Sequence, residues 1–288
     1  EIQQLFGYAG YFKVDPSPEG FAQGRFDLAY IKFDGQSLAF EVQGVDKTLL
    51  KVTLPDKIPP GEKITLDMEF EMALPHTFGR FGWHDKIIKS AYWYPILAKQ
   101  TKDGWETNEF YPFHRPFYSD AAVYEVDLRV PSDSVLIHSG YEKNKTAQGA
   151  QTIYHIATDF PIRAFSFSMS PDYQVERASY GQTTLQCFFL PGDEARARQA
   201  VENLKGVFAF YEKIFGPYPY KQFSVAPVHL GYGGEQMANM IFIDTRVFKL
   251  PGLLDREFDL LIAHEAGHQW LYNMIGADGN KELWLEEG

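Results

Sequence analysis

Apolar and polar residues alternate along much of the first 170 residues. The segments 64–72, 124–130 and 165–170 place an apolar side chain at every second position and mostly polar side chains between them. A period of two sends alternate side chains to opposite faces, which is typical of a half-buried β-strand. Turn residues such as Pro59-Pro60-Gly61 separate these segments, and no long helical period interrupts them. We therefore expect an antiparallel β saddle or sandwich in the N-terminal part.

The pattern changes near Pro171, where helical spacing appears beside short apolar runs. We expect strands and two long helices here, the strands at 184–190, 223–226 and 240–243 and the helices at 193–216 and 255–276. Asp193 is expected to cap the first helix, and Gly216-Pro217 to end it. The predicted class is α+β, with a β-rich N-terminal domain over residues 1–175 and a mixed α/β domain over residues 176–288.

Composition excludes several classes of protein. The formal net charge of −11 makes the chain a poor partner for nucleic acid or an anionic membrane surface. Cys187 is the single cysteine, which excludes an internal disulfide and a metal site built from cysteines. The apolar runs are too short to span a membrane. The localisation is unknown. Because the chain begins at Glu1 rather than Met, we expect it to be a soluble domain of a larger protein. A larger protein that is anchored in a membrane is also compatible with this sequence.

The second predicted helix carries His264-Glu265-Ala266-Gly267-His268. Side chains four positions apart lie on one helical face, so both imidazoles can bind the same metal ion. Glu265 is close enough to reach a water on that metal without being a ligand. A catalytic zinc site needs a third protein ligand, and Glu287 in the segment Trp284–Gly288 is the candidate.

A histidine pair at this spacing also fits an ordinary helix, in which the two side chains face solvent or a polar core. The remaining six histidines show no spacing typical of metal ligands. They are expected to be surface or hydrogen-bonded core residues, namely His76, His84, His114, His138, His155 and His229.

Together the motifs resemble those of the gluzincin zinc metallopeptidases, in particular the aminopeptidase N / leukotriene hydrolase family. The resemblance covers most of the chain, since four further segments are similar to bacterial members, at 92–98, 119–131, 210–220 and in the glycine-containing loop 231–234 that precedes 240–244. It implies a saddle-like β domain followed by the first half of a thermolysin-like catalytic domain. By position it makes His264, His268 and Glu287 the ligands of one Zn²⁺, with Glu265 as the general base and later the acid.

The substrate-binding segment, which is expected to be a loop, departs from the family. The family sequence is Gly-x-Met-Glu-Asn, whose glutamate binds the free α-amino group of the substrate, whereas this chain has Gly233-Gly234-Glu235-Gln236-Met237-Ala238-Asn239. The three possible alignments put Gln236, Glu235 or Ala238 at the glutamate position. A neutral side chain would bind an ammonium more weakly than a carboxylate. Gly233, Gly234, Glu235 and Gln236 are the predicted substrate-binding residues, the glycine backbone adding the peptide as a strand. The alternative for Glu235 and Gln236 is a solvated loop without a binding role.

The end of the chain is the second departure. In the family, a tyrosine that stabilises the oxyanion and a helical C-terminal domain follow the third ligand, whereas this sequence ends at Gly288. We therefore expect a catalytic domain truncated after Glu287, weakly active or inactive, whose missing partner is the C-terminal part of its own chain.

Three functions fit these observations. The first is a zinc-dependent aminopeptidase that hydrolyses peptides through a zinc-activated water and Glu265. The second is a zinc peptidase with altered specificity, acting on blocked or internal peptides. The third is a non-catalytic module that retains zinc and binds peptides as a scaffold. The presence of Glu265 argues against the third, because a module without catalysis has no need of a general base.

Overall fold

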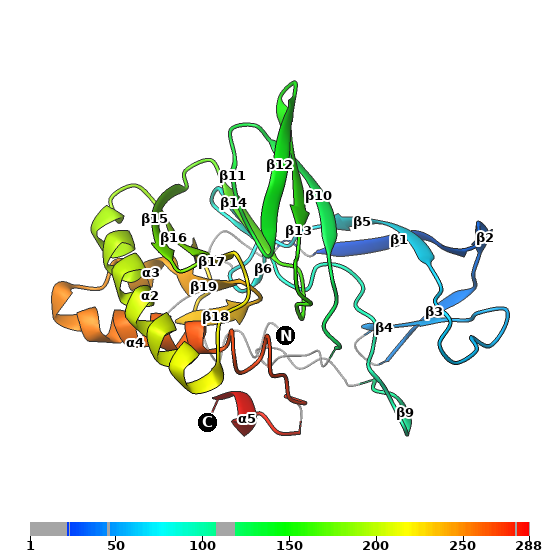
Figure 1. The fold of residues 1–288 in the computed structure, drawn as a ribbon. Coiled ribbons are helices and arrows are strands. Elements are labelled where there is room, and N and C mark those ends of the chain that lie inside the picture. The colour runs from blue at the N-terminus through cyan, green and yellow to red at the C-terminus, as the bar shows by residue number, and fades with distance from the viewer. Residues whose placement is uncertain (1–21, 23, 45–46, 108–118, 280, 288) are drawn as a thin grey trace.

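The computed structural model describes residues 22, 24–44, 47–107, 119–279 and 281–287, and within them it consists mostly of β-strands (Figure 1). Its long helices are confined to the C-terminal part, as the change of pattern near Pro171 predicts. None of the described helices combines the length and the apolarity that a bilayer crossing requires.

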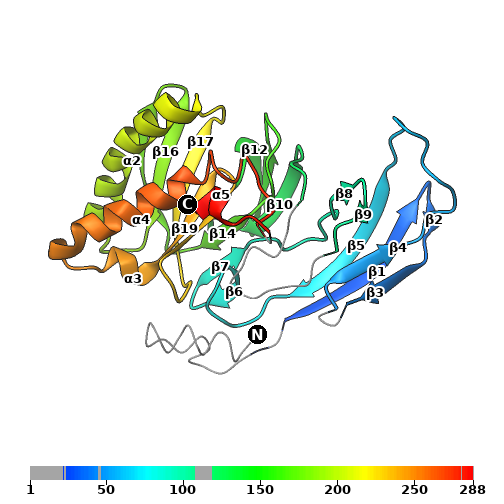
Figure 2. The same cartoon turned by 90° about the horizontal axis from the view of Figure 1, so that it is seen from below.

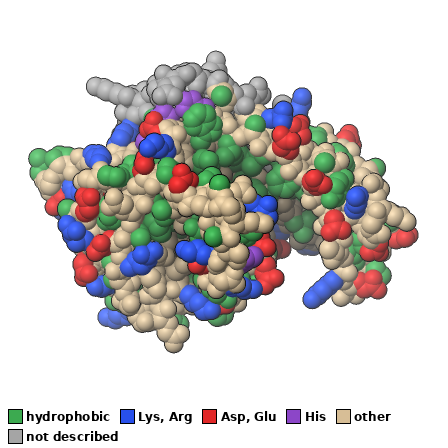
Figure 3. All heavy atoms as spheres, turned by 90° about the horizontal axis from the view of Figure 1, so that it is seen from above, with side chains coloured by type: hydrophobic (Ala, Val, Ile, Leu, Met, Phe, Trp, Pro, Cys, Tyr) green, Lys and Arg blue, Asp and Glu red, His purple; other side chains and the backbone are tan. Residues whose placement is uncertain are grey.

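The N-terminal strands form two small antiparallel sheets at one end of the molecule (Figure 2). Their order is β2-β1-β5 and β3-β4, with bounds Arg25–Phe33 (β1), Gln36–Ser37 (β2), Phe40–Gln43 (β3), Leu49–Val52 (β4) and Leu66–Ala73 (β5). Along β5, Met68, Phe70 and Met72 are half-buried and their neighbours are exposed, which confirms the predicted alternation. A hollow separates this end from the rest of the molecule (Figure 3).

The middle of the molecule contains two further antiparallel sheets, of order β10-β13-β12 and β11-β14-β7-β6. Their core contains Val130, Leu136, Ile156 and Phe165. The strand bounds are Phe81–His84 (β6), Ile87–Ser90 (β7), Glu125–Pro131 (β10), Val135–His138 (β11), Tyr141–Gln148 (β12), Gln151–Ala157 (β13) and Phe167–Ser170 (β14). A short hairpin of β8 (Gln100–Thr101) and β9 (Gly104–Trp105) precedes β10.

The C-terminal part is built on a five-stranded sheet of order β15-β16-β17-β19-β18. The three central strands are parallel and the two edge strands antiparallel. The strand bounds are Gln174–Tyr180 (β15), Thr183–Phe189 (β16), Gln222–Val228 (β17), Gly234–Met237 (β18) and Met240–Asp244 (β19). The helices are Glu194–Phe215 (α2), Thr245–Phe248 (α3), Gly252–Leu254 (η1), Asp255–Gly267 (α4) and Trp284–Glu287 (α5).

The five-stranded sheet is covered on both faces. On one face, α2 and α4 lie side by side and contribute Phe208 and Ile262 to a core with Leu185, Cys187 and Phe223 (Figures 1 and 2). On the other face, Phe188, Val228 and Phe242 pack against Ile87 and Ile137 of the middle sheet. The predicted domain boundary at residue 175 falls inside β15, and this second core joins the two sides of it.

Cys187 lies on the central strand β16 and is fully buried. Burial raises the pKa of its thiol well above the usual range. Both properties follow from its place in the core under α2.

Three local predictions are corrected by the structure. The helix expected over 255–276 ends at Gly267. Beyond it, the backbone N–H groups of residues 269–271 bond three or four residues back, and those of residues 273–275 bond five residues back, as from Asn273 to His268 at 3.0 Å. Tyr272 has φ +149°, outside helical geometry, and its hydroxyl bonds that of Tyr92 at 2.6 Å, so a tertiary contact overrides the helical pattern. Residues 234–237 form an edge strand rather than a loop.

The third correction concerns the start of α2. Asp193 occupies the N-cap position, but its side chain makes no capping bond. Its carboxylate instead accepts from Lys249 Nζ at 2.5 Å, since the buried acid lies beside the segment after α3. The Asp193 carboxylate thus pairs with a lysine, whereas the local sequence predicts that it bonds the first backbone N–H groups of α2.

Candidate metal centre

Helix α4 positions the motif because one of its faces is apolar. Phe258, Ile262 and Ala266 recur at intervals of four and are buried in the core beneath α2. Asp255 and Glu257 in the first turn favour the positive end of the helix. His264 and His268 project from a different side of the helix, at its C-terminal end.

The two histidines face each other closely. Their Nε2 atoms are 3.3 Å apart, and the rings meet edge to face with centroids separated by 4.8 Å. The Nδ1 atom of His268 lies 3.1 Å from the carbonyl oxygen of Leu271, a bond in which Nδ1–H must be the donor. This leaves the Nε2 lone pair for a metal ion, which is the usual way of orienting a histidine ligand.

Helix α5 returns Glu287 to the same point. The Oε2 atom of Glu287 lies 3.3 Å from His264 Nε2 and 3.5 Å from His268 Nε2. Buried Glu286 anchors this short helix, since its Oε1 atom accepts from the backbone N–H of Ala277 at 3.1 Å. Two imidazoles and one carboxylate are a donor set that zinc prefers. Ligand bonds of about 2.1 Å place tetrahedral donors about 3.4 Å apart, so the three residues fit a single ion.

Glu265 lies against the edge strand β18. It is buried, and a Cβ added at Gly234 would lie 2.8 Å from its Cγ and 2.9 Å from its Oε1. Only a glycine at position 234 therefore lets the carboxylate lie this close to the strand backbone. Among the described strands, β18 has one neighbour in the sheet, β19, so its other edge faces the α4 side.

The predicted substrate-binding residues lie together on and before β18, but their side chains differ from expectation. Glu235 is not a solvated loop residue, because its Oε1 accepts from Arg80 Nη1 and its Oε2 from the Tyr232 hydroxyl, each at 2.6 Å. Gln236 is buried. Gly233 accepts from the backbone N–H of Asp244 through its carbonyl. Arg80 lies 155 positions before Glu235, so local sequence gives no signal for this pair.

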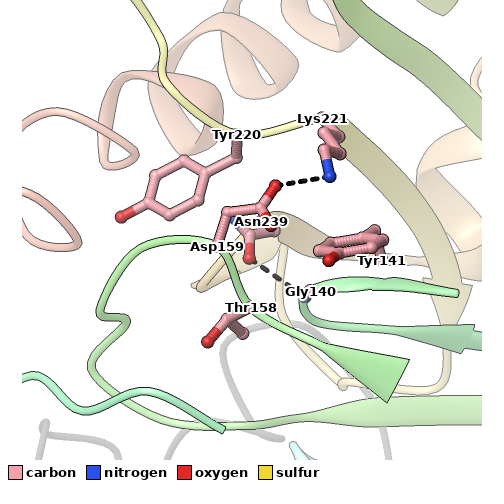
Figure 4. Close-up of a pocket in the computed structure, with 7 residues that line it drawn as sticks. All are labelled: Gly140, Tyr141, Thr158, Asp159, Tyr220, Lys221 and Asn239. Carbon is pink, nitrogen blue, oxygen red and sulfur yellow. Dashed lines mark hydrogen bonds and ion pairs between the residues drawn. The ribbon is translucent and has the colours of Figure 1, made fainter. Parts of the chain in front are cut away.

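Two buried amides fix the position of α4 and of the β18–β19 turn: Gln269 joins the end of α4 to the turn, and Asn239 joins the turn to the middle sheets. Gln269, directly after His268, accepts from the backbone N–H of Asn239 at 2.9 Å and donates to the Met237 carbonyl at 2.8 Å. Asn239, at φ +63° in the β18–β19 turn, accepts from the Gly140 N–H at 3.0 Å (Figure 4). Beside it, Lys221 pairs with Asp159 at 2.8 Å, so this crevice joins the middle sheets to the C-terminal part (Figure 4).

Sequence comparison identifies relatives of this chain. No protein-family model matches it. Leucine aminopeptidase 2 of Aspergillus terreus is 27% identical over 275 residues, covering 91% of this chain and 42% of the relative. Leukotriene A-4 hydrolase of Xenopus laevis is 22% identical over 84% of this chain and 39% of the relative. Mitochondrial aminopeptidase 2 of Saccharomyces cerevisiae is 31% identical over 114 residues, or 36% of this chain and 12% of the relative. The chain thus spans less than half the length of these relatives.

Solved structures show the same fold. The M1 zinc metallopeptidase from Deinococcus radiodurans matches 94% of this chain with TM-score 0.63 and 16% identity, over 61% of its own length. Aminopeptidase A of Legionella pneumophila matches 86% of this chain with TM-score 0.64 and 18% identity, over 29% of its own length. The sequence relatives, which are named aminopeptidases and a leukotriene hydrolase, agree with the resemblance found in the motifs, and the M1 zinc metallopeptidase and aminopeptidase structures share the fold of this chain.

Proposed function

We propose that this chain carries the metal centre of a peptidase that uses one Zn²⁺ held by His264, His268 and Glu287. The observation that carries the proposal is the convergence of their three donor atoms at 3.3–3.5 Å. When bound, zinc supplies a Lewis acid that polarises the scissile carbonyl and lowers the pKa of a water.

The protein residues supply proton transfer and orientation. Glu265 would accept the proton of the attacking water and deliver it to the leaving amine, as a general base and then a general acid. Strand β18 would bind the substrate in extended form along its free edge, through backbone hydrogen bonds. Gly234 leaves the strand without a side chain where it passes Glu265, and Gly233 does so beside Leu261, so backbone and carboxylate can meet the same peptide bond.

Aminopeptidase activity is the first specificity to test, because the sequence relatives carry that name. A second candidate is a peptidase that does not require a free N-terminus. The pairing of Glu235 with Arg80 favours this second candidate, because the carboxylate nearest the expected position already has a cationic partner.

We further propose that residues 176–288 are the first half of a thermolysin-like catalytic domain and that residues 1–175 form a separate β domain. The core between α2, α4 and the five-stranded sheet supports this, since its buried residues begin at Ile162 and the rest come from Leu185 onward.

The test compares Glu265→Gln with His264→Ala/His268→Ala. We expect Glu265→Gln to retain zinc and to bind tripeptides, measured by metal analysis and calorimetry, but to lose hydrolysis of aminoacyl reporters. The double variant should lose zinc from this centre. His155→Ala, a histidine paired with Asp127 on the middle sheet, is the control. Unchanged zinc content in the double variant, after allowance for a second site, would overturn the metal assignment. Equal binding of free and N-acetylated peptides would favour the second candidate.

A further inference from the structure

A second group of metal-binding side chains lies outside the metal centre. Asp85 Oδ2 is 3.3 Å from His229 Nε2 and 3.8 Å from His84 Nε2, and one donor atom from each residue lies within 4.8 Å of the others. Histidine side chains gather at one place on the face shown in Figure 3. Sequence spacing could not reveal the group, because 145 positions separate His84 from His229 (229 − 84).

The backbone brings these residues together for identifiable reasons. β6 and β7 pair through His84 and Ile87, so Asp85 and Lys86 form a two-residue turn. Asp85 has φ +49°, a left-handed conformation that aspartate tolerates better than most residues. The turn thus places the carboxylate directly beside the histidine that ends β6.

His229 reaches the hairpin from the C-terminal end of β17. Its Nδ1 atom lies 3.1 Å from the hydroxyl of Thr245, the first residue of α3, and this bond directs Nε2 toward Asp85. Phe78 packs beside both histidines, edge-on to His84 at 4.5 Å and parallel to His229 at 5.6 Å. A hydrogen bond on one ring nitrogen, with the other nitrogen directed at a carboxylate, is the arrangement that orients histidine ligands.

We propose that His84, Asp85 and His229 form a second, structural site for a zinc-like divalent ion. Two nitrogen donors and one oxygen suit zinc and similar transition metals, whereas Mg²⁺ and Ca²⁺ need oxygen ligands. Donor separations of 3.3 and 3.8 Å bracket the distance of about 3.4 Å expected around a tetrahedral ion. The Asp85 side chain is 62% exposed, which leaves an entry path and room for a water as fourth ligand.

The site would join two sheets that are far apart in sequence. His84 and Asp85 belong to the β6–β7 hairpin of the middle sheet, and His229 follows β17 of the five-stranded sheet. An ion that binds only the folded chain stabilises it in proportion to the logarithm of its concentration. The site therefore acts as a crosslink on the face opposite α2 and α4, distinct from the centre on α4.

The experiment measures the binding of Zn²⁺, with no other ligand added, to a chain in which His264 and His268 are replaced. In His264→Ala/His268→Ala, equilibrium dialysis should still find about one tightly bound zinc per chain, and its melting temperature should rise with zinc. Adding His84→Ala and His229→Ala should abolish both effects. Co²⁺ should give the visible spectrum of nitrogen- and oxygen-ligated cobalt only while these residues are present.

Asp85→Asn tests the site without the risk of misfolding, because this exposed turn residue can change without disturbing the core. Circular dichroism checks the fold of the variant. It should weaken zinc binding on the order of tenfold or more. His155→Ala should leave binding unchanged. A motif-deleted chain that binds no zinc, or binds it equally after Asp85→Asn and His229→Ala, would overturn the proposal. The reciprocal chain, His84→Ala/His229→Ala, tests the centre on α4 separately, so the two assignments can fail independently.

His114, which is among the six histidines without the spacing of metal ligands, lies outside the described residues.

Discussion

Gly234 and Glu265 come from different elements, yet the first determines where the second can lie. The Glu265 carboxylate occupies the volume that a side chain at position 234 would need. Catalytic groups lose much of their effect when displaced by about 1 Å. Under the proposed function, the glycine therefore helps to position the general base although it carries no functional group.

Replacing Gly234 with alanine tests this dependence. The added methyl group should displace Glu265 and lower kcat on the order of 10²-fold, while zinc binding at the α4 centre stays unchanged. Steady-state kinetics and metal analysis of the same preparation measure the two effects. Gly206→Ala on α2 is the control, because its new Cβ would meet nothing within 4 Å. Unchanged kcat in Gly234→Ala would contradict the placement of Glu265.

Lys89 makes stability depend on pH. Burial lowers its pKa to about 7, although the Asp244 carboxylate opposes the shift, and its Nζ donates to the Thr77 carbonyl at 2.9 Å. Between pH 7 and the unfolded value of 10.5, the unfolded chain holds a proton that the folded chain has released. Stability attributable to Lys89 therefore rises with pH in this window, by at most about 1.4 kcal/mol per pH unit.

Urea unfolding at pH 7, 8 and 9 measures this slope. Lys89→Met should flatten the rise, whereas Lys86→Met, an exposed lysine of the same hairpin, should keep it. Wild-type and Lys89→Met curves that run parallel over this range would show that Lys89 stays protonated in the folded chain.

Single residues also show what the sequence could predict. The spacing of His264 and His268 determines their geometry on a helix, and Glu287 is recognisable from the segment Trp284–Gly288 in which it lies. The Arg80–Glu235 pair and the His84–Asp85–His229 group were not predictable, because folding brings together residues that are more than a hundred positions apart. Local pattern carries information on periodicity, and long-range pairing depends on the whole fold.

At the scale of elements, α4 and the β18–β19 hairpin form one unit through Gln269. Removing its amide would leave the buried Asn239 N–H and Met237 carbonyl without this partner. We expect Gln269→Ala to cost on the order of 2–4 kcal/mol of unfolding free energy, since each unsatisfied buried group costs about 1–3 kcal/mol. Chemical denaturation measures the loss. Gln148→Ala, at an exposed hairpin end, should change little, and an equal effect in both variants would contradict this role.

Helix α5 is a second element whose position matters more than its length. Glu286 holds it through the Ala277 N–H, so Glu286→Ala should let Glu287 move and weaken zinc binding about 10- to 100-fold. Competition with a chelator measures the affinity, in the His84→Ala/His229→Ala background so that only the α4 centre contributes. Glu282→Ala is the exposed control. Equal affinity in both variants would show that α5 keeps its place without Glu286.

The ends of elements were the least predictable from sequence. The start of α4 at Asp255 follows from local pattern, whereas its end at Gly267 does not. A side chain at position 267 would meet the Tyr211 hydroxyl at 2.6 Å, and Tyr272 turns away to reach Tyr92. Both constraints come from other elements, so periodicity over 255–276 overestimated the helix.

At the scale of the whole molecule, buried apolar groups are distributed unevenly. Among the described residues of β1 to β5 only Ile31 is buried, and it belongs to none of the three core clusters. Segments with few buried contacts open locally at low free energy. Hydrogen exchange followed by mass spectrometry should therefore show faster exchange in 24–44 and 47–73 than in β16, β17 and β19. Equal protection of the two regions would contradict this difference in local stability.

The buried thiol of Cys187 provides a chemical probe of opening in the C-terminal part. Because it is the chain's single cysteine and its pKa is raised, a thiol reagent can modify it only when the sheet around β16 separates from α2. The alkylation rate then reports how readily this opening occurs, without an engineered label. Metal ions that stabilise the surrounding sheets should lower the alkylation rate, and chelators should raise it.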